Sequence, residues 1–157
     1  YHSSGDLFIA LPEEDIIITG DAVVPPSSMY LSESNFDNWY NLICRLSTLS
    51  YNTIVPGHGE IMDASIYRQM LNYMCDLRQA VRFQLNKMSE SEKETDSQEH
   101  ANTVADAILN DRENSAGARL VPQGIERKVR EHLVDVYRQF TGREPYKRYT
   151  HVIPAHE

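Results

Sequence analysis

Two short apolar runs rich in isoleucine and valine, residues 16–19 and 53–55, flank a segment with helical spacing. Prolines 25 and 26 break regular structure after the first run, and Ser34 or Asn35 is placed to cap a helix. The apolar positions that follow recur at helical spacing: Phe36, Trp39, Ile43, Leu46 and Leu49. Strand, helix and strand in this order predict a parallel crossover unit, which is right-handed in nearly all proteins.

A further strand is expected before this unit. Residues 7–11 are mostly apolar, and the Pro-Glu-Glu-Asp sequence at 12–15 has the composition of a turn. The two runs on either side of this turn therefore predict an antiparallel hairpin. Together with the crossover unit, the hairpin indicates an α/β fold.

The rest of the chain is dominated by helical patterns. We expect a long helix over 64–88, a shorter one over 102–109, and another after Pro122 that Gly142 ends. Residues 89–100 hold five acidic residues, one lysine and no large apolar residue, which is typical of a solvated loop or linker. We therefore divide the chain into an α/β part (1–88), an acidic loop or linker (89–100) and a helical extension (101–157) that packs on the same domain.

Charge and composition exclude some partners. The net charge of −8 argues against a general nucleic-acid or anionic-membrane surface, because binding to polyphosphate relies on clustered Lys and Arg. No apolar run reaches the roughly 18 residues of a membrane span. Cys44 and Cys75 do not form a CxxC pair, so we expect core thiols rather than a disulfide framework or a cysteine zinc site. A small-molecule substrate or another protein is the expected partner, and the cellular compartment stays open.

Three possible metal ligands, His2, Asp21 and His58, lie near glycines in turn-like sequence. In an antiparallel hairpin the start of the first strand and the end of the second share an edge, so residues 2–6 should neighbour Asp21. In a parallel crossover the two strand ends share an edge, which brings Asp21 and His58 to the carboxyl edge of the sheet. The topology therefore predicts that all three converge.

Two imidazoles and a carboxylate suit Zn²⁺, with Fe²⁺ or Mn²⁺ as alternatives. The side chains expected to hydrogen-bond the imidazoles and fix their orientation are Ser3, Ser4, Asp6 and Thr19. The sequence has no Gly-rich phosphate loop, no GxSxG elbow and no HExxH motif. Nucleotide hydrolysis, serine-esterase chemistry and zincin chemistry therefore lack their usual motifs.

Residues 1–62 resemble the C-terminal half of a metallo-β-lactamase-fold hydrolase. The motifs that carry the resemblance are His2-Ser3-Ser4-Gly5-Asp6, Ile18-Thr19-Gly20-Asp21 and Val55-Pro56-Gly57-His58-Gly59. The resemblance implies an αββα sandwich with one or two zinc ions at its edge. His2 would bind the first zinc, Asp21 would bridge the metals and take part in catalysis, and His58 would bind the second zinc. A metal-bound hydroxide would then attack an ester, thioester, lactone or lactam.

Two departures from the family pattern matter. Tyr1 stands where the family usually has glycine, and no His-x-His-x-Asp-His motif is present. The resemblance therefore implies that the remaining ligands lie in an N-terminal half outside this sequence or on another chain. We expect this chain alone to bind metal weakly, to have little hydrolase activity, and to cover its open sheet face with that half or by homo-oligomerisation.

The alternative is a non-catalytic α/β binding or interaction module. Such a protein would keep the motifs as scaffold and work through the predicted helices at 64–88 and 123–141. Both interpretations share the fold: half of an αββα sandwich with additional C-terminal helices.

Overall fold

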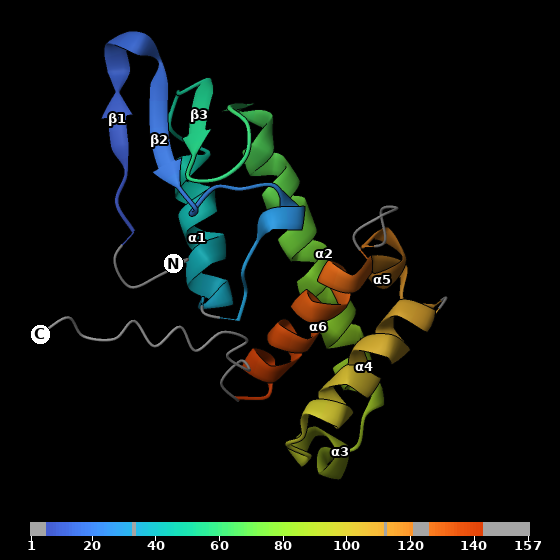
Figure 1. Cartoon of the computed structure of the whole chain (residues 1–157). Coiled ribbons are helices and arrows are strands. Elements are labelled where there is room, and N and C mark those ends of the chain that lie inside the picture. The colour runs from blue at the N-terminus through green and yellow to red at the C-terminus, as the bar shows by residue number, and fades with distance from the viewer. Residues whose placement is uncertain (1–5, 33, 112, 121–125, 143–157) are drawn as a thin grey trace, which may run out of the picture.

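The computed structural model describes residues 6–32, 34–111, 113–120 and 126–142. Over these residues the chain is an α/β protein with a four-stranded mixed sheet of order β1-β2-β3-β4. The strands are β1 (Ile9–Leu11), β2 (Ile16–Gly20), β3 (Thr53–Pro56) and β4 (Met62–Asp63). Figure 1 shows the sheet at one end of the molecule and α4, α5 and α6 at the other, with α2 running between them.

The predicted hairpin is confirmed. Strands β1 and β2 pair antiparallel, with Ile9 opposite Ile18 and Leu11 opposite Ile16. Their connection is one short 3-10 turn, η1 (Pro12–Glu14), closed by Asp15 in the left-handed conformation at φ 58°. The Asp15 carboxylate accepts hydrogen bonds from the backbone and the side-chain amide of Asn52, at 2.9 and 2.6 Å. The hairpin turn is therefore tied to the residue that precedes β3.

The predicted crossover is also confirmed, because β2 and β3 are parallel and α1 (Phe36–Leu46) lies between them in sequence. The second short 3-10 turn, η2 (Pro26–Ser28), precedes α1. The Asn35 side chain caps the start of α1 by accepting a hydrogen bond from the Asn38 amide at 2.9 Å. The expected apolar stripe is buried up to Leu46. Leu49, placed on that stripe by its spacing, is 44% exposed because the helix ends before it.

Five helices follow the sheet within the described ranges: α2 (Ser65–Lys87), α3 (Glu90–Glu94), α4 (Gln98–Asn110), α5 (Ser115–Arg119) and α6 (Glu126–Phe140). The helices predicted over 64–88, over 102–109 and after Pro122 are confirmed as α2, α4 and α6. The segment 89–100, expected to be a solvated loop or linker, instead holds α3 and the start of α4, and α3 begins with a capping box. Ser89 accepts from the Glu92 amide, and the Glu92 carboxylate accepts from the Ser89 amide in return. No residue of α3 is buried, so capping rather than apolar packing defines this helix.

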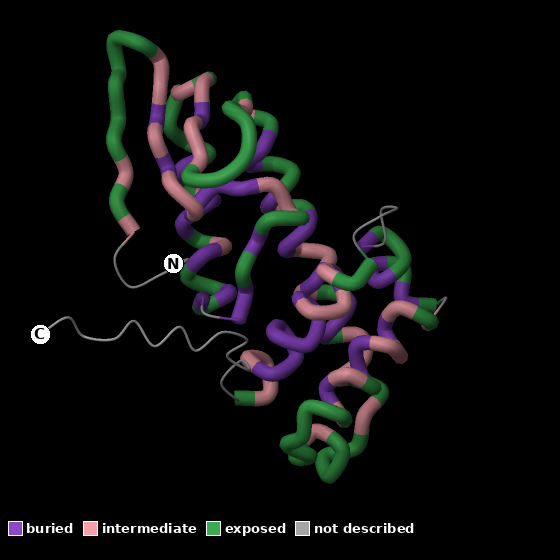
Figure 2. Tube along the Cα trace, viewed as in Figure 1, coloured by how far each residue is buried: buried purple, intermediate pink, exposed green. Residues whose placement is uncertain are grey.

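Helix α2 forms the centre of the core. It packs against α1 near the sheet and against α4, α5 and α6 beyond it, and Figure 2 shows many buried residues where these helices meet. A polar group is built into this core: the His132 ring on α6 is hydrogen-bonded to the Tyr73 hydroxyl at 2.7 Å and to the Met29 carbonyl at 3.0 Å. His132 is therefore a buried structural histidine. No helix in the described ranges is both long and apolar enough to cross a membrane.

The two faces of the sheet differ in burial. Ile17 and Ile54 are buried in the hydrophobic core. The residues that alternate with them form the other face, which we call the open sheet face: Ile9, Leu11, Ile16, Ile18 and Val55. On this face Ile9 is 49% and Leu11 37% exposed. Apolar side chains of the sheet thus remain accessible over the part of the chain that the structure describes.

Candidate functional site

Asp21 and His58 lie together at the carboxyl ends of two neighbouring parallel strands. The Asp21 Oδ1 atom is 2.7 Å from the His58 Nδ1 atom. Asp21 directly follows β2, and His58 comes two residues after β3. The side chain of His58 is 80% exposed and that of Asp21 31%. The parallel pairing of β2 and β3 therefore produces an accessible pair of side chains, called here the Asp21–His58 pair.

The backbone on both sides fixes Asp21. Before it, the pairing of β2 with β3 shifts register between Ile18 and Gly20, and Gly20 adopts a left-handed φ of 53°. After it, Ala22 is buried, its amide donates to the Thr19 carbonyl at 3.3 Å and its carbonyl accepts from the Trp39 indole N–H at 2.8 Å. The turn that carries Asp21 is thus fastened to α1.

The loop that carries His58 approaches Asp21 closely through glycine. A Cβ atom added at Gly57 would lie 2.6 Å from the Asp21 Oδ1 atom, well inside van der Waals contact. Gly59 has a φ of 95°, which favours glycine, but a Cβ there would meet nothing within 4 Å. A side chain at position 57 would therefore have to displace the Asp21 carboxylate, whereas at position 59 the turn of the backbone favours glycine.

The hydrogen bond decides which imidazole nitrogen is available. When Asp21 is ionised it can only accept, so a neutral His58 donates its Nδ1–H to Oδ1. The Nε2 atom then carries the lone pair. In this arrangement the pair can offer Nε2 to a metal ion while Asp21 holds the imidazole. Alternatively, a metal ion can replace the proton between Nδ1 and Oδ1 and be bound by both atoms.

The other predicted site residues have different positions. Thr19 is buried, and its hydroxyl donates to the Val55 carbonyl at 3.4 Å, so it links β2 to β3 rather than contacting an imidazole. Asp6 is partly buried and precedes β1. His2, Ser3 and Ser4 lie outside the described residues. Within the described ranges, no group of three or more His, Cys, Asp or Glu side chains is arranged to hold a metal ion.

Sequence reasoning missed two residues that shape this site. The spacing of Trp39 predicts a core position, which is correct, but the indole N–H also donates to the carbonyl of Ala22, next to Asp21. The turn-like sequence around Gly57 does not indicate that its neighbour in space is the Asp21 carboxylate. A buried tryptophan usually needs a hydrogen-bond partner for its N–H. The sequence therefore indicates that a polar group lies near Trp39, but it does not identify that group.

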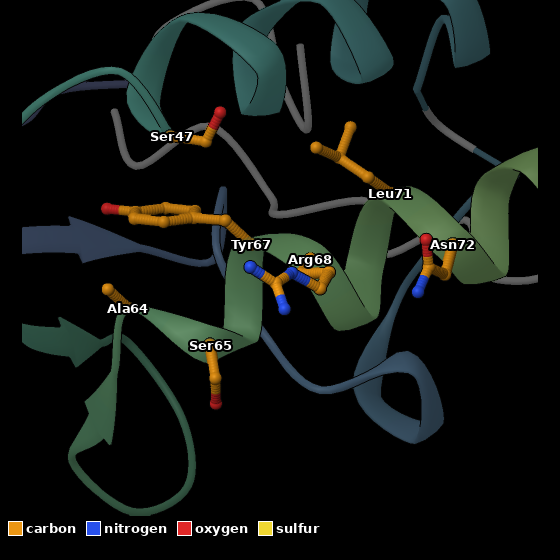
Figure 3. Close-up of a pocket in the computed structure, with 7 residues that line it drawn as sticks. All are labelled: Ser47, Ala64, Ser65, Tyr67, Arg68, Leu71 and Asn72. Atoms are coloured by element: carbon orange, nitrogen blue, oxygen red, sulfur yellow. The ribbon is translucent and has the colours of Figure 1, made fainter.

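A separate pocket of about 540 Å³ lies at the start of α2. Because α2 follows β4, which pairs with the beginning of β3, this pocket is at the edge of the sheet opposite His58. Figure 3 shows the Tyr67 ring between Ser47 and Ala64, with the Arg68 side chain beside it. The buried Tyr67 hydroxyl has no hydrogen-bond partner among the described residues, whereas Arg68 is exposed. The pocket shares no residue with the Asp21–His58 pair.

Comparison of the chain with models of protein families, with curated proteins and with solved structures finds no match.

Proposed function

We propose that the Asp21–His58 pair is part of the metal site of a zinc-dependent hydrolase that cleaves an ester, thioester, lactone or lactam. The observation that carries the proposal is the 2.7 Å contact between a carboxylate and an imidazole at the carboxyl ends of β2 and β3. Ligands bind at this edge in open α/β sheets. The resemblance of the surrounding motifs to the metallo-β-lactamase fold supports the reaction class.

The chemistry of the two side chains fits zinc, and also iron or manganese. Imidazole nitrogen and carboxylate oxygen are common ligands of these metals, and both groups are accessible from solvent. A catalytic zinc site usually takes three protein ligands, so the pair supplies part of a set. When bound, zinc would supply Lewis acidity and lower the pKa of coordinated water.

The chain's own residues have distinct tasks in this proposal. Asp21 orients the His58 imidazole and offers a carboxylate oxygen. Trp39 holds the turn of Asp21 through the Ala22 carbonyl, and Gly57 leaves space for the carboxylate. The turn that carries Asp21 is therefore fixed before any ligand arrives, which favours binding because less conformational freedom is lost. The remaining ligands are proposed to come from His2 and from a further polypeptide segment.

The second candidate is a non-catalytic interaction module. The apolar faces of α2 and α6 are buried in the core, so these helices do not offer the surface that this candidate was expected to use. The open sheet face does offer an apolar surface. An interaction module would therefore work through the sheet, and a hydrolase fragment would use the same face to dock its other half.

Calorimetric titration of zinc into the chain tests the proposal. The chain should bind zinc weakly, because only part of the ligand set is present, and it should not turn over a lactone or thioester. Asp21→Asn and His58→Gln should each abolish the binding, whereas Glu60→Gln, which removes an exposed carboxylate from the same loop, should leave it unchanged. Binding that survives both site substitutions would contradict the assignment. Tight one-to-one binding with turnover would show that the chain needs no further ligands.

A further inference from the structure

The pocket at the start of α2 has a single charged residue, Arg68, among the described residues that line it. Its volume of about 540 Å³ is in the range of small-molecule binding sites. The exposed Arg68 side chain has no ion-pair partner in the part of the chain that the structure describes, whereas Arg78, Arg119 and Arg130 each pair with an aspartate. In a protein of net charge −8, this pocket therefore presents a positive charge that pairs with no described carboxylate.

The lining around Arg68 combines hydrogen-bond donors with apolar surface. Asn72 lies one helical turn after Arg68 on the same exposed face of α2. Its side-chain amide has no hydrogen-bond partner within the described ranges, so its N–H donors are available to a ligand. Tyr67 and Leu71 contribute apolar atoms to the wall (Figure 3). A polar and an apolar part thus lie side by side in one pocket.

The first turn of α2 already has its own carboxylate. The Ser65 amide donates to the Asp63 carboxylate at 2.7 Å. Hydrogen bonds from Ser65 hold the pKa of Asp63 below its ordinary value of 3.8, so this carboxylate is ionised at neutral pH. It would repel a second anion from the end of the helix. The negative charge of a ligand is therefore assigned to the side chains of Arg68 and Asn72 and not to the backbone amides.

We propose that this pocket binds a small molecule that carries one carboxylate or phosphate group on an apolar body. A guanidinium group binds the oxygens of either anion through two parallel N–H···O hydrogen bonds, and the Asn72 amide supplies a further donor. The apolar body packs against Tyr67 and Leu71. The pocket shares no residue with the Asp21–His58 pair, so this site binds its ligand whether or not that pair binds zinc.

Titration of the full ¹⁵N-labelled chain with benzoate and with phenyl phosphate, followed by NMR, tests the proposal. The side-chain resonances of Arg68 and Asn72 should shift and reach saturation, with a Kd on the order of 1 mM for probes of this size. Benzyl alcohol, which has the ring without the charge, should bind at least about tenfold more weakly. Tighter binding of benzoate would identify the ligand's anionic group as a carboxylate, and tighter binding of phenyl phosphate would identify it as a phosphate; either order supports an anion site.

Arg68→Gln should weaken the binding of both anions by about tenfold or more, because the charge-assisted hydrogen bonds are lost. Arg82→Gln is the matched control, because it removes the same charge from an exposed arginine about 20 Å further along α2, and it should leave the binding unchanged. Equal weakening in both variants would show adventitious anion binding only and would overturn the proposal. So would benzyl alcohol that binds as tightly as the anions, or Arg68 and Asn72 resonances that respond to neither anion.

Discussion

At the scale of single residues, Gly57 is a position where an added side chain would collide with the candidate site. Replacement of Gly57 by alanine places a methyl group 2.6 Å from the Asp21 Oδ1 atom. We predict that Gly57→Ala displaces the carboxylate and breaks its hydrogen bond to His58. The ¹⁵N resonances of the His58 imidazole should then shift away from those of the wild-type protein.

Gly59→Ala is the matched control, because a Cβ there meets nothing within 4 Å although the backbone has a φ of 95°. It should cost about 1–2 kcal/mol of stability through backbone strain and leave the His58 resonances unchanged. The same imidazole shift in both variants would show that strain in the loop, rather than contact with Asp21, controls the pair.

A second residue-scale prediction concerns the buried histidine. Tyr73→Phe removes the hydroxyl that lies 2.7 Å from the Nδ1 atom of the buried His132 and so deletes this hydrogen bond. The free energy of unfolding should fall by about 1–3 kcal/mol, the usual cost of a buried polar group that loses its hydrogen bond. Urea denaturation measures it.

Tyr67→Phe provides the comparison. The Tyr67 hydroxyl is buried but has no hydrogen-bond partner in the described ranges, so its removal should be neutral or stabilising. If Tyr67→Phe destabilised the protein as much as Tyr73→Phe, the hydrogen bond to His132 would not be the cause.

At the scale of elements, α4 and α6 are joined by an ion pair that makes stability depend on pH. Arg130 donates to both Asp106 carboxylate oxygens, through Nε and through Nη2 at 2.7 Å. These hydrogen bonds hold the pKa of Asp106 below its ordinary value of 3.8. A folded-state pKa below the unfolded one stabilises the protein above the unfolded value, and this contribution is lost as the pH falls through the folded-state value.

We predict that Asp106→Asn lowers stability near neutral pH by less than about 1 kcal/mol, because the pair is partly exposed and screened by solvent. Below pH 3.8 the difference between variant and wild type should shrink. Thermal unfolding across this pH range measures both effects. A stability difference that grows as the pH falls would have the wrong sign for this account.

Some of these elements could be predicted from the sequence and others could not. The hairpin, the crossover and the long helices could be predicted because runs of isoleucine and valine and helical spacing of apolar residues are local signals. Helix α3 was missed because its signal is the capping pair Ser89 and Glu92, which lies in a segment without apolar residues. The meeting of Asp21 and His58 could be predicted from topology. The hydrogen bond from Trp39 and the contact at Gly57 could not, since both depend on how α1 and the loop pack in three dimensions.

At the scale of the whole molecule, the sheet packs its helices on one face and keeps apolar residues accessible on the other. An exposed apolar patch of this kind marks an interaction surface or a risk of aggregation. We propose that it is covered by a further polypeptide segment or by a second copy of the chain. The isolated chain should therefore associate in solution or bind a hydrophobic dye.

Replacement of Ile9 and Leu11 together by serine should reduce both association and dye binding, as measured by light scattering and fluorescence. Leu49→Ser is the control, because Leu49 is 44% exposed but lies after α1 and outside the sheet. A monodisperse wild-type monomer that binds no dye would argue against this use of the sheet.

Zinc titration followed by NMR of ¹⁵N-labelled histidine tests directly whether the Asp21–His58 pair binds metal. The His58 imidazole resonances should shift as zinc is added, while those of His132, whose ring nitrogens are both hydrogen-bonded in the core, stay in place. In Asp21→Asn the shift of His58 should disappear. A His58 signal that does not respond to zinc, or one that responds equally without the Asp21 carboxylate, would contradict the proposed metal site.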